Sequence, residues 1–456
     1  MFRRLKVRFP FTVRRPLHPG VPDRGWPSGT VVVTPASRAV AAARTLIGCE
    51  LLAFATGALA SSDDGGLRMG PIEAYPALEL ALSYDDNVFR APFAQRASFV
   101  GVLNPALLLK AKLRRNEFAL GYQAQIGRYQ NARQNNYEDH EVIGNVYLDL
   151  STRNRLNVEA GYFAGHDPIG TNRTEGATGL LEAALLQEEP DRFDIVRAAA
   201  TYSYGAEGAS GRLDAYGGYF SKTYQNNREV TAVFDRDETN LGGIFYWRVR
   251  PRASWLLELQ GIRFDYDVAN LDSTEFSAVT GVAWATTAKT TGTVKLGYQQ
   301  KDLDDSAQVD FRGIAWSAGV QWAPVTYSVF SLETSRVPKE RSGSGLFKVV
   351  QEAGISWSHK WRDRVTSTAS FSFANEDFRG SARVDDRWHA GLRLDFKMRR
   401  WLALAIAYDY DKRDSDEEQF NFDQNTVSLL VTVGLPGSPA ATLPPVGAPT
   451  GAPIAP

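Results

Sequence analysis

Hydrophobic and polar positions alternate along most of this chain, and the alternation is most regular between residues 276 and 300. One set of alternate positions there is aromatic or aliphatic, and it comprises Phe276, Ala278, Val282, Trp284, Val294, Leu296 and Tyr298. The other set is small or polar, and a polar turn separates the two halves. Because successive side chains of a strand leave opposite faces, this pattern predicts an antiparallel hairpin with one apolar face.

The alternation extends from residue 76 to residue 434, and its connecting segments are of two kinds. Short, mostly basic turns fall near 114–116, 153–155, 205–211, 250–253, 288–291, 323–326, 361–364 and 399–401. Longer, mostly acidic loops fall near 89–97, 131–137, 166–191, 226–237, 268–274, 303–308, 337–346, 378–384 and 412–420. These connectors predict an all-β fold of eighteen strands, with sixteen as the alternative count.

An even number of antiparallel strands with short turns at one end and long loops at the other is typical of outer-membrane barrels. We therefore predict a closed transmembrane β-barrel with short periplasmic turns and longer extracellular loops. A soluble sandwich or propeller is the alternative. It fits less well because the predicted strands exceed the usual length of about 5–6 residues in soluble sheets.

Tryptophan is concentrated near the predicted periplasmic turns. Seven of the ten tryptophans lie within a few residues of a short turn, namely Trp247, Trp255, Trp284, Trp322, Trp357, Trp361 and Trp401. Amphipathic aromatic rings favour the boundary between lipid and water, where they form a girdle around a membrane barrel. This distribution predicts an aromatic girdle at the periplasmic interface.

The N-terminal 60 residues differ in composition from the rest. Arg38 and Arg44 precede an apolar run at 45–60 that ends in small residues, which predicts a secretory signal within a 1–60 extension. The single cysteine, Cys49, lies in that run, so cleavage after Ala60 leaves no thiol in the mature chain. We expect a periplasmic linker at 61–75, the barrel at 76–434, and a disordered tail at 435–456, which is rich in proline.

Charge and motifs exclude several functions. The formal net charge of the chain is −1. The first 60 residues contain nine Lys and Arg and two acidic residues, so the rest of the chain has a net negative charge. We therefore expect no nucleic-acid partner. The five histidines have no metal-ligand spacing, and we expect no cofactor and no metal. His140 and His389 are the candidates for a hydrolytic site assembled between strands, but we expect no enzyme.

The predicted inward positions carry the chemistry of the barrel lumen. Alternation assigns to this wall Glu79, Lys110, Lys112, Glu117, Gln123, Gln125, Glu141, Asp149, Glu159, Asp214, Glu258 and Lys295. A mixture of both charges and amides suits hydrated or weakly charged cargo. A barrel of 16–18 strands is also wide enough to hold water unless it is plugged.

The longest loop, 166–191, contains the sequence TGLLEAALLQEE. Leu180, Leu181, Leu185 and Leu186 predict a short amphipathic helix. This helix folds into the mouth as a gate in one interpretation and lies outside as a cap in the other. If it is a gate, deletion of residues 176–189 raises the single-channel conductance.

Several longer runs resemble a family of outer-membrane β-barrel porins associated with exopolysaccharide and capsule biosynthesis loci. They are YDDNVF (84–89), GHDPIGTNRTEG (165–176), YSYGAEGASGRLD (202–214), DETNLGGIFYWRVRP (237–251), ATTAKTTGTVKLGYQ (285–299), ISWSHKWRDRVTSTASFSFANEDF (355–378) and RRWLALAIAYDYDKRDS (399–415). The resemblance covers about residues 76–434 and implies a barrel that takes part in polysaccharide export or surface assembly in a Gram-negative bacterium. It implies no catalytic residues.

Three functions remain open from the sequence. The first is a passive conduit for polysaccharide, with outer-membrane lipids, the polysaccharide and periplasmic export components as partners. The second is a general diffusion porin. The third is a plugged barrel that serves as a structural anchor.

Overall fold

The computed structural model describes residues 60–61, 66–176, 189–206, 208–287, 289–340, 343 and 345–435. The strands in these ranges are β1 (Ala60–Ser61), β2 (Leu67–Met69), β3 (Ile72–Asp85), β4 (Ser98–Leu113), β5 (Asn116–Tyr129), β6 (Tyr137–Ser151), β7 (Asn154–Asp167), β8 (Asp191–Tyr204), β9 (Gly211–Tyr224), β10 (Arg236–Arg250), β11 (Ala253–Tyr266), β12 (Ser273–Thr287), β13 (Thr290–Leu303), β14 (Phe311–Val325), β15 (Ser328–Glu340), β16 (Phe347–Arg362), β17 (Val365–Arg379), β18 (Val384–Arg399), β19 (Leu402–Ser415) and β20 (Phe422–Gly434). The predicted signal segment, the helix around Leu180 and the tail beyond Leu435 lie outside the described residues.

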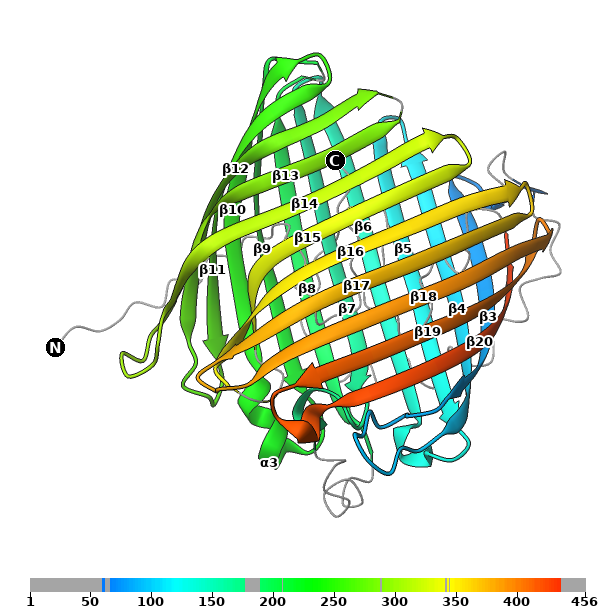
Figure 1. Ribbon diagram of the computed structural model, residues 1–456. Helices are drawn as coiled ribbons and strands as arrows, with labels where there is room; N and C mark the ends of the chain where they lie inside the picture. The colour runs from blue at the N-terminus through cyan, green and yellow to red at the C-terminus, as the bar shows by residue number, and fades with distance from the viewer. Residues whose placement is uncertain are drawn as a thin grey trace.

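Strands β3 to β20 form one closed antiparallel barrel (Figure 1). Each strand pairs with its neighbour in sequence, and β20 closes the ring by pairing with β3 from Thr426↔Asp85 to Gly434↔Ala77. The prediction of a closed eighteen-stranded antiparallel barrel is therefore confirmed. Strands β1 and β2 add a short antiparallel pair at the start of β3.

The start of the barrel differs slightly from the prediction. Strand β3 begins at Ile72, so the boundary expected at residue 76 falls inside this strand, and the expected linker contains β2 and part of β3. The predicted start rested on the alternation, which is regular from Pro76 onward. Within β3, the Pro76 carbonyl accepts a hydrogen bond from the Leu435 amide at 3.4 Å.

Helical segments occur only as short turns within the described loops. They are η2 (Arg133–Asn135), η3 (Asn172–Thr174), α3 (Arg228–Thr231), η5 (Ala232–Phe234) and η6 (Glu418–Phe420). Among the residues described, none of the helices has the length and apolar character needed to cross a membrane.

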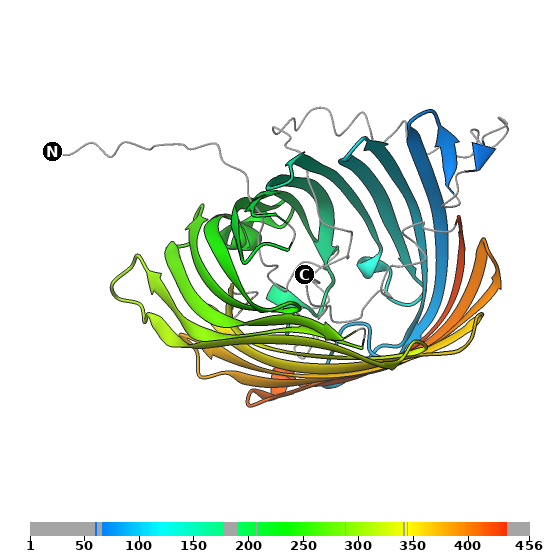
Figure 2. The ribbon, with the colours of Figure 1, turned by 90° about the horizontal axis from the view of Figure 1, so that it is seen from above.

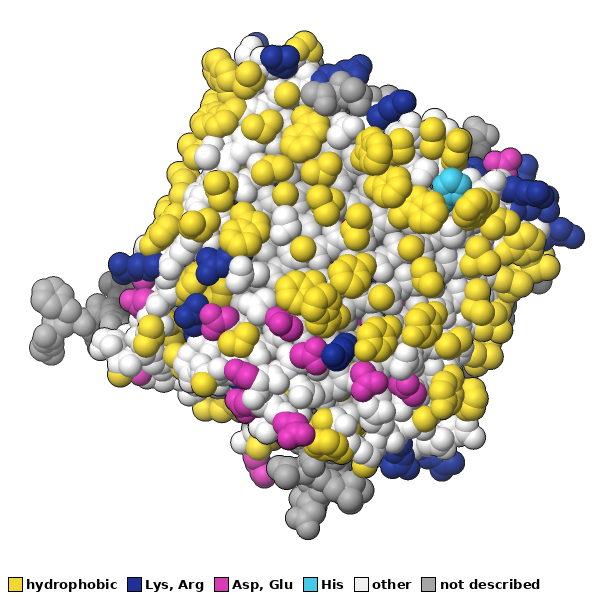
Figure 3. All heavy atoms as spheres, in the orientation of Figure 1, with side chains coloured by type: hydrophobic (Ala, Val, Ile, Leu, Met, Phe, Trp, Pro, Cys, Tyr) yellow, Lys and Arg dark blue, Asp and Glu magenta, His cyan; other side chains and the backbone are white. Residues whose placement is uncertain are grey.

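The wall has an apolar outer face and a polar inner face, as alternation dictates. On β3, Leu78, Leu80 and Leu82 are exposed, whereas the intervening Glu79 and Ala81 are buried. Figure 3 shows hydrophobic side chains spread over the middle of the outer wall, with Asp and Glu gathered toward the lower end, where the long loops lie. The predicted apolar face of the β12–β13 hairpin also points outward, because its large side chains Phe276, Val282, Val294, Leu296 and Tyr298 are exposed.

The hydrogen-bonded wall is interrupted between β14 and β15. Pairing between these strands ends at Trp316↔Arg336, although β14 continues to Phe311 and remains paired with β13 there. The last part of β15 stays paired with β16 as far as Glu340↔Phe347. The outer end of the β15–β16 hairpin therefore leaves the line of the wall.

This hairpin end packs against the inner side of the preceding strands. Phe347 and Val349 of β16 are 1% exposed and join a buried cluster whose other members are Ile262, Phe264, Tyr266, Leu271, Leu303 and Phe311. On β16, Phe347 and Val349 alternate in step with Ile355, which is exposed on the outer face. The two layers of wall thus overlap at this point, with β11, β13 and β14 outside and the hairpin end inside.

Candidate functional site in the barrel interior

The described part of the β7–β8 loop crosses the barrel interior. Glu175 of this loop accepts hydrogen bonds from Arg413 Nη2 at 2.9 Å and from Arg383 Nη2 at 3.1 Å. Arg413 lies on β19, which is six strands away from β7 by the shorter way around the wall. Figure 2 looks down on the barrel and shows segments from the loops inside its ring of strands. The loop thus connects two distant parts of the wall.

The first residues of the loop are held near β7 by packing and hydrogen bonds. The Ile169 amide donates to Asn135 Oδ1 at 3.0 Å, and the Ile169 side chain is buried against Phe89 and its neighbours. Gly170 has a φ of +92°, and a Cβ atom there would lie 1.9 Å from the Phe89 carbonyl oxygen. Only glycine fits this close approach, so the loop leaves β7 in a fixed direction.

The far end of the loop meets a compact group of charges and aromatic rings, which we call the anchor cluster. It consists of Glu175, Arg383, Asp385, Arg413 and Phe420. Arg383 Nε donates to Asp385 Oδ1 at 2.8 Å, and its guanidinium carbon lies 3.5 Å from the centre of the Phe420 ring. Asp385 Oδ2 also lies 3.6 Å from Arg413 Nε. Within the anchor cluster, Glu175 and Asp385 each pair with both arginines.

The environment of Glu175 keeps its carboxylate charged. Burial alone raises its pKa, but the nearby Arg413, Lys348 and Arg383 outweigh burial, and the pKa of Glu175 is lowered from its ordinary value of 4.5. A carboxyl group with a lowered pKa stabilises the folded contact above its ordinary pKa and loses that contribution as the pH falls through the lowered value.

We therefore expect the loop to stay anchored at pH 4.5 and to be released only at lower pH. Single-channel recordings across this range should show a conductance rise below pH 4.5 in the wild-type protein. The Glu175→Gln variant, which cannot titrate at this position, should lack this pH step. A rise centred above pH 4.5, or the same step in the variant, would exclude Glu175 as its cause.

Several residues predicted for the lumen wall lie in buried polar clusters on the inner face. Glu79 accepts hydrogen bonds from Asn104 Nδ2 at 3.2 Å and Thr432 Oγ1 at 3.1 Å. Gln123 Nε2 donates to Glu141 Oε2 at 2.8 Å. These contacts join neighbouring strands across the inner face.

Two predicted wall carboxylates form ion pairs on the inner face. Glu141 also receives a hydrogen bond from Arg197 at 3.0 Å. Glu258 is bound by Tyr216 Oη at 2.6 Å and by Lys295 Nζ at 2.7 Å. Gln125 is buried on the same face of β5 as Gln123.

The remaining predicted wall residues lie nearer the periplasmic end. Lys112 Nζ and Glu117 Oε1 form an exposed ion pair at 2.6 Å, and Lys110 Nζ lies 5.2 Å from the centre of the Tyr75 ring. The other pairs are Asp149 with Arg115 at 3.8 Å and Asp214 with Arg212 at 3.2 Å. Glu159 is half-buried on β7. Most of the predicted ionic residues thus have a neighbour of opposite charge.

The predicted girdle tryptophans lie on the outer side near the short turns. Trp247 and Trp255 are direct cross-strand partners on β10 and β11. The exposed members are Trp247, Trp255, Trp322, Trp361 and Trp401, and the half-buried members are Trp284 and Trp357. Trp357 donates from Nε1 to Ser328 Oγ at 2.9 Å, which is the kind of polar contact that tryptophan makes at an interface.

The two histidines considered for catalysis do not share a site. His140 lies on β6 and contacts Tyr122 Oη through Nδ1 at 3.0 Å. His389 lies on β18, with Nδ1 3.2 Å from Asp411 Oδ1. Groups of three His, Cys, Asp or Glu side chains that could hold a metal ion are not found among the described residues.

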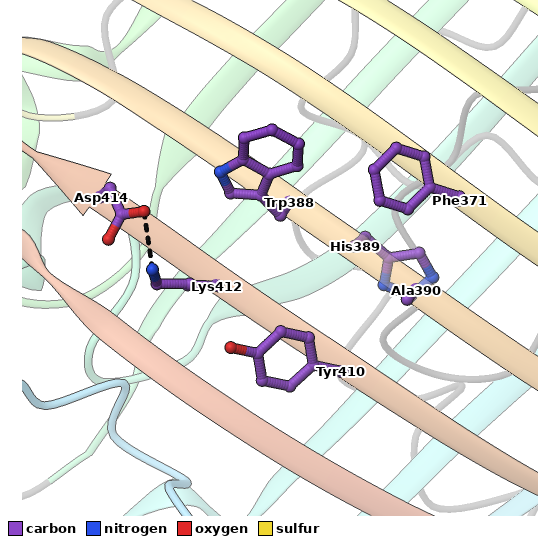
Figure 4. A pocket seen from close by; sticks show the side chains of 7 residues that line it. All are labelled: Phe371, Trp388, His389, Ala390, Tyr410, Lys412 and Asp414. Atoms are coloured by element: carbon purple, nitrogen blue, oxygen red, sulfur yellow. Dashed lines mark ion pairs between the residues drawn. The ribbon is translucent and has the colours of Figure 1, made fainter.

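A shallow depression of about 350 Å³ lies between β17, β18 and β19 (Figure 4). It is lined by Phe371, Trp388, His389, Ala390, Tyr410, Lys412 and Asp414. Lys412 and Asp414 form an ion pair at 2.8 Å. Most of these side chains alternate in step with the exposed Leu392, so the depression belongs mainly to the outer face.

The anchor cluster could not be predicted from the sequence. Glu175 lies in the run GHDPIGTNRTEG, but its partners Arg383 and Arg413 are separated from it by 208 and 238 residues. The sequence does predict, in one interpretation, that the long loop folds into the mouth. That prediction rests on the leucines at 180–186, which follow Glu175. The described contact uses a charged residue before them.

A closed barrel with an apolar outer face, charges at its two ends and a loop across its interior defines an outer-membrane channel protein of the porin type. The chain belongs to the family described as "Putative beta-barrel porin 2", whose model matches residues 62–435. It is accordingly a protein of the outer membrane. This match identifies the porin family and carries no information about exopolysaccharide or capsule loci.

Solved structures that match the chain include proteins from two bacteria. The outer membrane protein opdK from Pseudomonas aeruginosa has 13% identity and a TM-score of 0.43, with 80% of this chain and 98% of that chain covered. OccK2 (OpdF) from Pseudomonas aeruginosa in complex with glucuronate has 12% identity and a TM-score of 0.44, with coverage of 79% and 98%.

The FrpB iron transporter from Neisseria meningitidis has 9% identity and a TM-score of 0.43. The match covers 74% of this chain but only 62% of the transporter. No curated protein matches the chain.

Proposed function

We propose that this porin-type channel is a passive conduit for a hydrated polysaccharide, or for its fragments, in export or surface assembly. The observation that carries the proposal is the inner wall, where carboxylates are paired with cations or amides, as in the Tyr216–Glu258–Lys295 group. Such a wall offers many hydrogen-bonding groups while its charges compensate one another. It therefore suits a chain rich in hydroxyl groups better than an apolar solute.

The anchored loop supports a controlled passage. Glu175 holds the loop across the interior through two arginines, so the free cross-section depends on this contact. A long polymer needs periplasmic components to supply it and to provide the driving force, and we include such components as partners. Outer-membrane lipids surround the apolar outer face.

The experiment that tests this proposal is a bilayer conductance measurement with and without the host's own surface polysaccharide. We expect polysaccharide fragments added on the periplasmic side to interrupt the ionic current, with dwell times that increase with fragment length. Unrelated neutral sugars of the same size are the control. Equal interruption by both sugars would favour the general diffusion porin.

A deletion in the host distinguishes export from simple permeability. We expect loss of surface polysaccharide together with accumulation in the periplasm, and restoration by the wild-type gene. Normal surface polysaccharide in the deletion strain would contradict the proposal. One observation favours the alternative of a plugged barrel that serves as a structural anchor. Both the β7–β8 loop and the β15–β16 hairpin end enter the barrel interior. This alternative predicts a folded barrel without conductance.

A further inference from the structure

The two ends of the barrel carry opposite charge. Counted between the strand ends, the eight short turns contain seven Lys and Arg and two acidic residues. The nine longer loops at the other end contain seven Lys and Arg and fifteen acidic residues. Figure 3 shows Lys and Arg side chains along the rim of short turns, at the top and upper right of the view. Because short turns are periplasmic in outer-membrane barrels, the periplasmic end is the positive one.

Many cations at the periplasmic end have no carboxylate partner. Some cations there do form ion pairs, such as Arg212 with Asp214 at 3.2 Å. Within the described part of the chain, however, no carboxylate lies within 4 Å of Arg153, Arg248, Arg252, Arg364, Lys397 or Arg400. The excess positive charge of this end is therefore available to a partner.

Two of these cations face the lumen from opposite sides of the ring. Arg248 of β10 alternates with the exposed Trp247, and Lys397 of β18 alternates with the exposed Phe396, so both cationic side chains point to the inner face. Both positions precede the bulge in their strand, where the alternation is still regular. Strands β10 and β18 are eight strands apart in the ring of eighteen. Arg248 is half-buried and Lys397 is exposed, so both are accessible from the mouth.

The charge changes along the axis of the barrel. Deeper in the lumen the charges are compensated, as where Lys295 pairs with Glu258 at 2.7 Å. At the extracellular end the excess is acidic, and the loop at 304–310 contains three aspartates and no Lys or Arg. An anion that enters from the periplasm is therefore attracted at the mouth and is held less strongly beyond it.

We propose that the periplasmic mouth selects an anionic polysaccharide, in which acidic groups recur along the chain. This inference rests on the proposed conduit function and assigns the class of its cargo. Guanidinium and ammonium groups bind anionic oxygens through charge-assisted hydrogen bonds. A polymer presents many such oxygens, so it contacts several of the spaced cations at once. The head group of an anionic lipid fits Arg248 and Lys397 less well, because these side chains point away from the lipid.

Attraction of this kind depends on salt. The Debye length falls from about 8 Å at physiological ionic strength to about 3 Å at 1 M, so exposed cations lose most of their reach at high salt. We therefore expect the anionic chain to bind the mouth strongly at low salt and weakly at 1 M. A neutral chain has no such dependence.

The test measures binding of a fluorescently labelled hexuronic-acid oligomer to the full chain in non-ionic detergent, and binding of the same oligomer after reduction of its carboxyl groups. We expect the acidic oligomer to bind at least about tenfold more tightly than the reduced one. The Arg248→Gln/Lys397→Gln variant should lose about tenfold in affinity for the acidic oligomer and none for the reduced one. The Arg248→Lys/Lys397→Arg variant keeps both charges and should bind as the wild type does.

Arg263→Gln/Lys412→Gln is the matched control. It also removes one arginine and one lysine, but from the extracellular end, where they pair with Asp304 at 2.8 Å and with Asp414 at 2.8 Å. Circular dichroism confirms folding of each variant. Equal binding of the two oligomers, or equal losses in the mouth variant and the control, would overturn the proposal.

Current recordings with the same oligomers separate this inference from the proposed function. We expect the acidic oligomer, added on the periplasmic side, to interrupt the ionic current more often than the reduced one. Equal interruption by both would overturn the selection for charge and leave the passage itself. Charge-selective binding without any interruption would support the anionic site and contradict the conduit.

Discussion

Replacing Lys301 with methionine should lower the free energy of unfolding by about 3–5 kcal/mol, the cost of leaving a buried carboxylate without its cation. The Lys301 and Glu340 side chains are 2% and 7% exposed, and Lys301 Nζ also lies 3.5 Å from the centre of the Phe264 ring. Among the described residues, Glu340 would keep the hydrogen bond from Tyr266 Oη at 2.5 Å. Denaturant titration of the barrel, followed by tryptophan fluorescence, measures the loss.

Two variants separate the ion pair from a general effect of the substitution. The double variant Lys301→Met/Glu340→Leu should recover most of the lost stability, because a well-packed apolar pair often replaces a buried ion pair at little cost. Lys112→Met removes an exposed pair of the same residue types, and should cost less than about 1 kcal/mol. A loss in Lys301→Met no greater than that in Lys112→Met would contradict the proposed role.

Movement of the hairpin can be followed separately from global unfolding. With Cys49 replaced, a single cysteine at position 349 reports the exposure of a side chain that is 1% exposed in the closed overlap. We expect slow labelling by a membrane-impermeant maleimide in the wild-type background and fast labelling with Lys301→Met. Equal rates would show that the hairpin stays in place without the ion pair.

The Glu175→Gln variant should release the β7–β8 loop from the anchor cluster and raise the single-channel conductance. The substitution removes one of the two carboxylates that pair with both Arg383 and Arg413, and Asp385 is the other. Loss of a buried carboxylate from two cations costs about 3 kcal/mol, which shifts the ratio of anchored to released loop by about 100-fold. Recordings in planar bilayers at neutral pH measure the conductance and the open fraction.

The control lies at the other end of the same loop. Glu189 pairs with Arg192 at 3.4 Å, and both side chains are about half exposed, so Glu189→Gln should leave the conductance unchanged. If Glu175→Gln also leaves it unchanged while the protein folds normally, the anchored loop does not limit the passage. Another segment would then limit the conductance of the lumen, and the β15–β16 hairpin end is the next segment to test.

The sequence by itself determined the wall of this protein. Alternation with a period of two identifies the two faces of each strand, as in Phe276 to Tyr298, and the regular change from short turns to long loops determines the number and direction of the strands. Those features are local, because each depends on residues within one strand or one connection. For the same reason the positions of Glu79, Glu141 and Glu258 on the inner face followed from their place in the pattern.

Only the tertiary structure decided what covers each face and what enters the barrel. Phe347 and Val349 occupy outward positions in the pattern of β16, yet they pack against protein because the hairpin end bends inside β14. Glu175 finds Arg383 and Arg413 only once the ring has closed. An alternating pattern specifies which side a residue faces, but contacts between distant strands depend on closure and on the path of the loops. The anchor cluster and the buried cluster around Phe347 are contacts of this second kind.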